Sequence, residues 1–118
     1  MSRADGVLVA PLKKVWFYMI DAGTKDHEYR KDGDGKETWA RRLLTPDGLL
    51  VYRQDPMGLQ LHHFAKYHTF RGSFGYSSRW TERKVMGIRW GLPRPEWSGD
   101  TVSGPCFIIE LEPKHHGP

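Results

Sequence analysis

The sequence has a single cysteine, Cys106, among its 118 residues. One thiol cannot form an intramolecular disulfide, and it excludes a zinc site built from several thiolates. Long apolar runs are also missing: the longest, Val15 to Ile20, is far shorter than the roughly 20 residues of a membrane-spanning helix. The amino terminus lacks the apolar core of a signal peptide. These absences predict a chain with no membrane segment in a reducing compartment, and we expect it in the cytoplasm.

Acidic residues are almost missing from the segment between His62 and Arg94, where Glu82 is the only one. Lysine and arginine occur seven times in the same segment, so it has a net charge of +6, whereas the whole chain has +4. Phe, Tyr and Trp residues are interleaved with these cations. Phosphates bind to cations and nucleobases stack on aromatic rings. This basic-aromatic segment therefore predicts a surface for nucleic acid, or for an acidic protein complex that carries nucleic acid.

The expected contact residues of the basic-aromatic segment are six cations and two rings. The cations, expected to meet phosphates or acidic groups, are Lys66, Arg71, Arg79, Arg83, Lys84 and Arg89, and the stacking or anchoring rings are Tyr76 and Trp80. A plainer interpretation remains open, in which the rings form the core and the cations are a solvated outer face. Three features favour binding: rings surround a glycine-rich stretch, most of the cations are arginines, and acids are lacking.

Three functions stay open on this sequence. The first is a small, basic, non-enzymatic protein that binds DNA or RNA by shape or as a single strand, because no known base-reading motif is present. The second is a protein-interaction inhibitor, of the type that mobile elements or phages use to block a host nucleic-acid machine. The third is a metal-independent nuclease or toxin that depends on histidine. The sequence leaves the oligomeric state open.

Catalytic patterns are weak in this chain. In a helix from Met57 to His68, the side chains of His62, His63 and His68 would share no face, and the i, i+4 spacing of a helical zinc pair is missing. No serine lies in a nucleophile elbow, and no glycine-rich loop has the spacing that holds a nucleotide. We therefore assign no catalytic residue, no metal ligand and no cofactor.

The stretch Asp32-Gly33-Asp34-Gly35 is similar to the middle of a calcium-binding EF-hand loop. Alignment on these residues puts Arg30 and Arg41 at the first and last ligand positions, where the loop needs carboxylates. The stretch therefore predicts a solvated turn and not a calcium site.

The length suits one domain over residues 1–118, with residues 112–118 as a frayed tail. The expected fold class is α+β: a mostly antiparallel sheet of about four to six strands with one helix, about residues 56–68, packed on it. A buried strand is expected at 15–20, a loop or hairpin tip at 24–36 and a hairpin of 37–44 with 49–53 around a turn at 45–48. After the helix we expect a loop at 72–78, a strand at 84–90, a connection at 91–99 and a last strand at 106–111.

Overall fold

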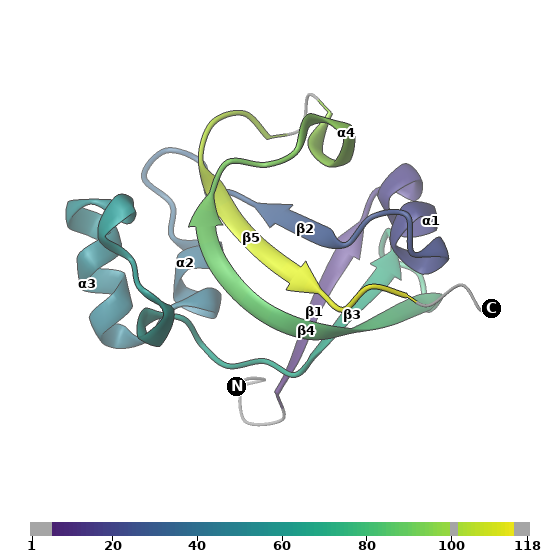
Figure 1. Cartoon of the computed structure of the whole chain (residues 1–118), viewed down its shortest axis with the longest axis horizontal. Helices are drawn as coiled ribbons and strands as arrows, with labels where there is room; N and C mark the ends of the chain where they lie inside the picture. Colours follow the sequence, from purple (N-terminus) through teal and green to yellow (C-terminus); the bar gives the residue numbers. More distant parts are fainter. Residues whose placement is uncertain (1–5, 100–101, 115–118) are drawn as a thin grey trace.

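One long strand, β4 (Trp80–Gly91), bends across the molecule and connects two halves of a five-stranded sheet (Figure 1). The structure is a computed structural model that describes residues 6–99 and 102–114. The other strands there are β1 (Val7–Leu12), β2 (His27–Arg30), β3 (Thr69–Phe74) and β5 (Cys106–Leu111). The strand order is β1-β3-β4-β5-β2, and only the β1–β3 pair is parallel.

The two halves of the sheet share β4 but use different parts of it. Its first part pairs with β3, from Ser73 opposite Trp80 to Thr69 opposite Lys84. Its second part, from Val85 to Gly91, pairs with β5, and a register shift between Val85 and Gly87 lies near the start of this part. An irregularity of this kind increases the local twist and bends a strand. The bend lets the two half-sheets enclose a common core.

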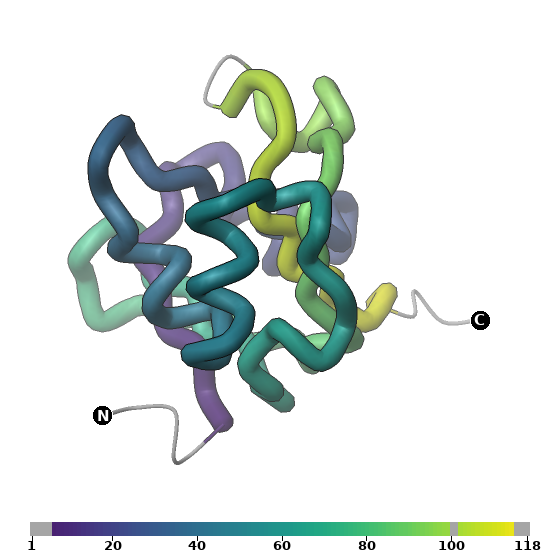
Figure 2. The backbone as a smooth tube through the Cα atoms, turned by 90° about the vertical axis from the view of Figure 1, so that its left-hand side faces the viewer, coloured from purple at the N-terminus to yellow at the C-terminus, as the bar shows by residue number. Residues whose placement is uncertain are grey.

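Helices close the two ends of the bent sheet (Figure 1). At one end lies α1 (Lys14–Ala22), and at the other lie α2 (Thr38–Leu43) and α3 (Pro46–Gln54), which are nearest the viewer in Figure 2. Two 3-10 turns, η2 (Pro56–Gly58) and η3 (Leu61–His63), follow α3, and the short α4 (Pro95–Ser98) lies between β4 and β5.

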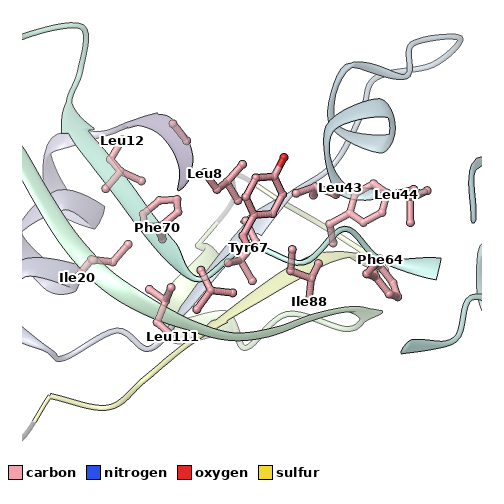
Figure 3. Close-up of a cluster of buried hydrophobic side chains, with 14 of the residues drawn as sticks. Leu8, Leu12, Ile20, Leu43, Leu44, Phe64, Tyr67, Phe70, Ile88 and Leu111 are labelled. Atoms are coloured by element: carbon pink, nitrogen blue, oxygen red, sulfur yellow. The ribbon is translucent and has the colours of Figure 1, made fainter. Parts of the chain in front are cut away.

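The main core lies between the half-sheets and the helices (Figure 3). Phe17, Phe70 and Phe107 are at most 1% exposed, and burial of such a side chain contributes about 1.5–3 kcal/mol. A second, smaller cluster lies on the other face of β5, where Cys106 and Ile108 pack with Tyr29. Because β5 is buried on both faces, its first four residues form a continuous apolar run and do not alternate with polar ones.

The predicted fold class is confirmed. The chain forms one α+β domain with a five-stranded, mostly antiparallel sheet, although it has more helices than expected. The predicted strand at 106–111 coincides with β5, and the strand predicted at 84–90 is the second half of β4. Residues 115–118 of the expected frayed tail lie outside the described residues.

The strand predicted at 15–20 was wrong, because these residues belong to α1. Phe17 and Ile20 are buried whereas Val15 and Tyr18 are exposed, which is the three-residue spacing of a helix face. Gly23 ends the helix with a φ of 82°, and its N–H donates to the carbonyl of Ile20. A six-residue apolar run does not distinguish a strand from a helix by periodicity alone.

The hairpin predicted around residues 45–48 was also wrong, because α2 and α3 occupy this stretch. Thr45 is the N-cap of α3, since its hydroxyl accepts from the N–H of Gly48, and Pro46 is in the first turn. Gly48 is helical and packs closely, because a Cβ there would come within 2.4 Å of the carbonyl oxygen of His63. The same residues that form a turn can thus start a helix.

The helix predicted at 56–68 is not formed. Asp55 does cap a turn, as expected, and its carboxylate accepts from the N–H of Met57. The chain then becomes extended at Leu59 and Gln60, and a bridge pairs Phe64 with Leu44. Leu61, which the helix would have buried, is 81% exposed. The loops expected at 24–36 and 72–78 also proved partly wrong, since they contain β2 and the end of β3.

Candidate functional site

Four cations of the basic-aromatic segment form ion pairs, three of them with acids from other parts of the chain. The Nε of Arg89 lies 3.3 Å from Oε2 of Glu110 on the neighbouring strand β5. The Nζ of Lys84 lies 3.9 Å from Oε2 of Glu112, which directly follows β5. Arg71 forms an ion pair with Glu82 between β3 and β4. The acids that the segment lacks in sequence are therefore supplied in space, mainly by the end of the chain. This pairing leaves less positive potential than the local charge of +6 indicated.

Arg83 lies inside the protein and not on its surface. It is 5% exposed, its Nη2 is 2.7 Å from Asp26, and it donates to the carbonyls of Ile20, Lys25 and Glu112. A guanidinium with all of its directions occupied in this way holds the end of α1, the turn after it and the carboxyl end of β5 together. The placement of Arg83 fits a structural role better than the partner contact predicted for it.

Four of the predicted residues, Arg71, Tyr76, Arg79 and Trp80, belong to the β3–β4 hairpin and lie at or near its tip. We define the hairpin surface as Tyr18, Arg71, Tyr76, Arg79 and Trp80. Tyr76 is 97% exposed and Trp80 is 47% exposed. The guanidinium of Arg79 donates to the hydroxyl of Tyr18, while that of Arg71 lies 5.7 Å from the ring of Trp80. The hairpin surface therefore carries rings and cations on both sides of its tip.

Arg79 differs from the paired cations of the same segment. Its guanidinium lies 5.3–5.7 Å from the rings of Phe17, Tyr18 and Phe74. No carboxylate of the described residues forms an ion pair with it. An exposed guanidinium on aromatic faces keeps its donors available for a phosphate.

Lys66 is apart from the hairpin surface. It is exposed and lines a groove that runs between residues 60–67 and the bulge of β4. Leu61 and Met86 line the same groove, and they are 81% and 60% exposed. The predicted cations are thus divided among a hairpin tip, ion pairs on the sheet and this apolar groove.

The histidines form no catalytic arrangement among the residues that the structure describes. The rings of His62 and His63 are 4.0 Å apart, but His63 is buried and its Nδ1 accepts from the N–H of Gln60. Nδ1 of His68 is 2.7 Å from the hydroxyl of Thr69. Across residues 6–99 and 102–114, no three potential ligand residues are grouped to hold a metal ion. The Asp34-Gly35 stretch forms the turn that was predicted.

A cavity that the sequence did not reveal lies beside β2. Three of the five tryptophans form its walls: Trp16 from α1, Trp39 from α2 and Trp97 from α4. Its volume is about 390 Å³, within the range of small-molecule sites. We call it the tryptophan pocket. All three tryptophans are half-buried, so each presents part of its ring to the cavity.

Charged side chains of β2 and the turn before it form the floor of the tryptophan pocket. The Nζ of Lys25 is 3.2 Å from Oε1 of Glu28, and the Nε of Arg30 is 2.9 Å from Oε2 of the same carboxylate. Lys25 is 2% exposed, and its Nζ also lies 4.1 Å from the ring centroid of Trp16. Arg30 stacks on Trp39 at 4.7 Å. Two cations thus share one buried carboxylate beneath aromatic walls.

Burial controls the ionisation of this region. Desolvation lowers the pKa of Lys25, and the adjacent Glu28 opposes that shift. The pKa of the nearby His27 is also lowered, mainly by desolvation, although Glu110 acts in the other direction. Burial raises the pKa of the Cys106 thiol to about 11, which makes it a poor nucleophile. Perturbed ionisable groups around a cavity are typical of functional sites.

Sequence reasoning missed the tryptophan pocket because its residues come from five separate helices and strands. Lys25, Glu28 and Arg30 lie within six residues of one another, but in the sequence they belong to a polar stretch that is typical of a loop. Three tryptophans separated by 23 and 58 residues give no pattern that a sequence alone can place together.

Comparisons with protein-family models, with curated proteins and with solved structures gave no match. The helices described here are all too short or too polar to cross a lipid bilayer. The function is therefore argued from the two regions themselves.

Proposed function

We propose that this protein is a small, non-enzymatic, cytoplasmic protein whose hairpin surface binds single-stranded nucleic acid. The observation that supports this most is at the tip of the β3–β4 hairpin, where the exposed Arg79 has no carboxylate partner among the described residues and lies beside the exposed ring of Tyr18. Each nucleobase has a face that stacks on Tyr76 or Trp80, and Arg79 supplies a phosphate contact. Exposed rings on a tip suit a flexible strand better than a duplex, whose bases are already stacked.

The proposal uses fewer residues than the sequence indicated. Tyr76, Arg79 and Trp80 stay in it, together with Arg71, which is paired with Glu82 but lies beside the ring of Trp80. Arg83 is buried, and Lys84 and Arg89 are paired away from the tip. An exposed ion pair stabilises weakly, by about 0–1 kcal/mol, so Lys84 and Arg89 keep a secondary part in steering a polyanion. Lys66 lies in the groove, away from the tip.

The test is fluorescence anisotropy with labelled single-stranded DNA and RNA and with matched duplexes, from low to physiological salt. We expect Tyr76→Ala with Arg79→Ala to weaken single-strand binding at least about 10-fold, since stacking contributes about 1–3 kcal/mol per base. The slope of log K against log salt should decrease by about 0.7 for the lost phosphate contact.

Arg89→Ala is the matched control, because it removes an exposed arginine of the same segment that is paired with Glu110. It should leave the affinity for the oligonucleotide within about 3-fold of that of the unmodified protein, because salt screens an exposed charge that does not contact the strand. Equal losses in both variants would assign binding to net charge and not to the hairpin surface. No binding at low salt would remove the proposal, and cleavage of the oligonucleotide would favour the nuclease interpretation.

A protein-interaction inhibitor is the second candidate, and the apolar groove supports it. Leu61 and Met86 expose most of their surface there, and exposed apolar patches are common at protein interfaces. In this function the protein would block a host nucleic-acid machine by binding its protein. Retention of a defined complex from a nuclease-treated extract, lost in Leu61→Glu with Met86→Glu but kept in Tyr76→Ala with Arg79→Ala, would favour this candidate over the first.

A further inference from the structure

The tryptophan pocket has the chemistry of a ligand site, and it shares no residue with the hairpin surface. Its floor holds the buried Lys25 and Glu28 and the partly buried Arg30, so two cations face one carboxylate and the floor has a formal excess of one positive charge. At the rim, Lys31 adds a positive charge, while the carboxylate of Asp32 accepts from the N–H groups of Trp39 and Ala40 at the start of α2. A buried excess of positive charge is costly unless an anion accompanies it.

The walls of the pocket favour a flat molecule. Trp16, Trp39 and Trp97 come from three different helices and leave a space of about 390 Å³ between them. Trp39 is held between the guanidiniums of Arg30 and Arg42, at 4.7 and 4.4 Å, and Trp97 packs edge-to-face on His27 at 5.0 Å. Rings fixed in this way form rigid stacking surfaces and lose little conformational entropy on binding.

The ammonium of Lys25 is placed to meet an anion. Glu28 is the oxygen partner of its Nζ among the described residues, and the rings of Trp16 and Tyr29 lie around it at 4.1 and 5.7 Å. An ammonium has three N–H donors, and rings are weaker acceptors than a carboxylate or a phosphate. A ligand oxygen would therefore gain a charge-assisted hydrogen bond in a site of low dielectric.

We propose that the tryptophan pocket binds a small planar aromatic anion, with the ring between the tryptophans and the anionic group toward Lys25 and Arg30. This inference does not rest on the proposed nucleic-acid function. The anionic group could belong to a free aromatic carboxylate or to a mononucleotide, which share a flat ring and a negative charge. The two sources differ in size and in anion type, so a titration can separate them.

The experiment records the tryptophan indole N–H signals of the ¹⁵N-labelled protein by NMR. The probes are 2-naphthoate and AMP, with 2-naphthamide and adenosine as their neutral counterparts. With at least one anion, we expect the signals of Trp16, Trp39 and Trp97 to shift and saturate, while those of Trp80 and Trp90 stay in place. The neutral counterpart should bind at least about 10-fold more weakly, the loss of one charge-assisted contact. Saturation with 2-naphthoate alone identifies the carboxylate, and saturation with AMP alone identifies the nucleotide.

Variants of the pocket lysines test whether the preference for an anion over its neutral counterpart depends on the charges of the pocket. Lys25→Met keeps the length and apolar stem of the side chain, and Glu28 keeps Arg30 as its partner. It should reduce affinity for the anion about 10-fold and leave that for the neutral counterpart unchanged. If Lys25→Met does not fold, Lys31→Gln at the exposed rim should reduce the anion preference by a smaller factor.

Three outcomes would overturn the proposal. The first is no shift with either anion at millimolar concentration, and the second is equal shifts at Trp80 and at the pocket tryptophans. The third is equal affinity for an anion and its neutral counterpart, which would show an apolar cavity without charge recognition. Loss of oligonucleotide binding at the hairpin surface would leave this result unchanged, because the two sites share no residue.

Discussion

The hairpin surface and the tryptophan pocket contain the same kinds of side chain, cations against aromatic rings, but in opposite settings. In the hairpin surface Arg79 and Tyr76 are exposed, and the rings are the main neighbours of the cation. In the pocket Lys25 is buried, and the single carboxylate of Glu28 pairs with both it and Arg30. Burial makes charges strongly interdependent, whereas water screens them. Composition alone therefore does not determine whether a basic-aromatic group binds a partner or holds the fold together.

The difference between buried and exposed cations predicts the largest contrast in stability for Arg83 and Arg79, two arginines of the basic-aromatic segment. Arg83→Met should lower the free energy of unfolding by about 3–5 kcal/mol, because Asp26 and three carbonyls lose their donor. Arg79→Met should change it by about 0.5 kcal/mol or less, since Arg79 is exposed. Urea unfolding followed by circular dichroism measures both. Similar values for the two variants would contradict the distinction between a buried and an exposed cation.

A second matched pair concerns carboxylates. Glu28→Gln leaves the buried Lys25 and the partly buried Arg30 without their common counter-charge, and it should cost roughly 3 kcal/mol of stability. Glu82→Gln removes the partner of Arg71 in an exposed pair, and it should cost under about 1 kcal/mol. Thermal unfolding of both variants at one pH is sufficient to compare them. A loss below about 1 kcal/mol for Glu28→Gln would mean that water reaches the floor of the pocket.

The third comparison concerns two aromatic rings, and the expected difference in stability between their variants is smaller. Trp39→Ala removes a half-buried ring that lies between Arg30 and Arg42, so we expect a loss of about 2 kcal/mol. Tyr76→Ala removes a ring that is 97% exposed, and it should leave stability unchanged while it weakens oligonucleotide binding. Denaturation and anisotropy on both variants separate stability from binding. A large stability loss in Tyr76→Ala would place that ring in contacts that the fold does not show.

Sequence reasoning predicted the parts of the fold whose signal is carried by consecutive residues. The stretch Cys106 to Leu111, apolar except for Glu110, was predicted correctly as a strand, and both faces of β5 are buried. Val15 to Ile20 looked similar but forms α1, since its two buried residues are three apart and Gly23 provides a helix end. The Thr45-Pro46-Asp47-Gly48 stretch suits both a turn and a capped helix start, and tertiary packing against His63 selects the helix.

The candidate site was predictable only where exposure followed from local sequence. Tyr76 lies at a hairpin tip whose glycine, Gly75, has a φ of 57°, and such a position leaves the ring in water. Arg83 and Arg89 look alike in sequence, but their environments depend on Asp26 and Glu110, which are distant along the chain. The charge count of a segment says nothing about acids that the fold brings to it. That is why the positive potential was overestimated and the buried triad at the floor of the pocket was missed.

The smallest predicted effect is a pH dependence of the folding stability, which comes from His27 beside the tryptophan pocket and not from the hairpin surface. His27 lies 5.0 Å from Trp97 and 3.0 Å from the hydroxyl of Tyr29, with Glu110, Arg89, Arg94 and Asp26 as its charged neighbours. Desolvation lowers its pKa below the 6.5 of an exposed histidine, so the unfolded chain takes up a proton at a higher pH than the folded one. Above pH 6.5 both states are neutral and His27 adds no pH dependence. As the pH falls from 6.5 toward the lower folded pKa, the unfolded state gains protons first and stability decreases.

His27→Gln should remove this decrease, and urea unfolding at several pH values between 7.5 and 5 measures it. Glu37, whose pKa is lowered by Arg53, affects stability only below its usual value of 4.5, outside this window. The hairpin surface contains no histidine, so its oligonucleotide affinity should change in parallel in the unmodified protein and in His27→Gln. An increase of stability on acidification that depends on His27 would mean that Glu110 dominates over burial, and that the edge of the pocket is more open to water than its packing against Trp97 implies.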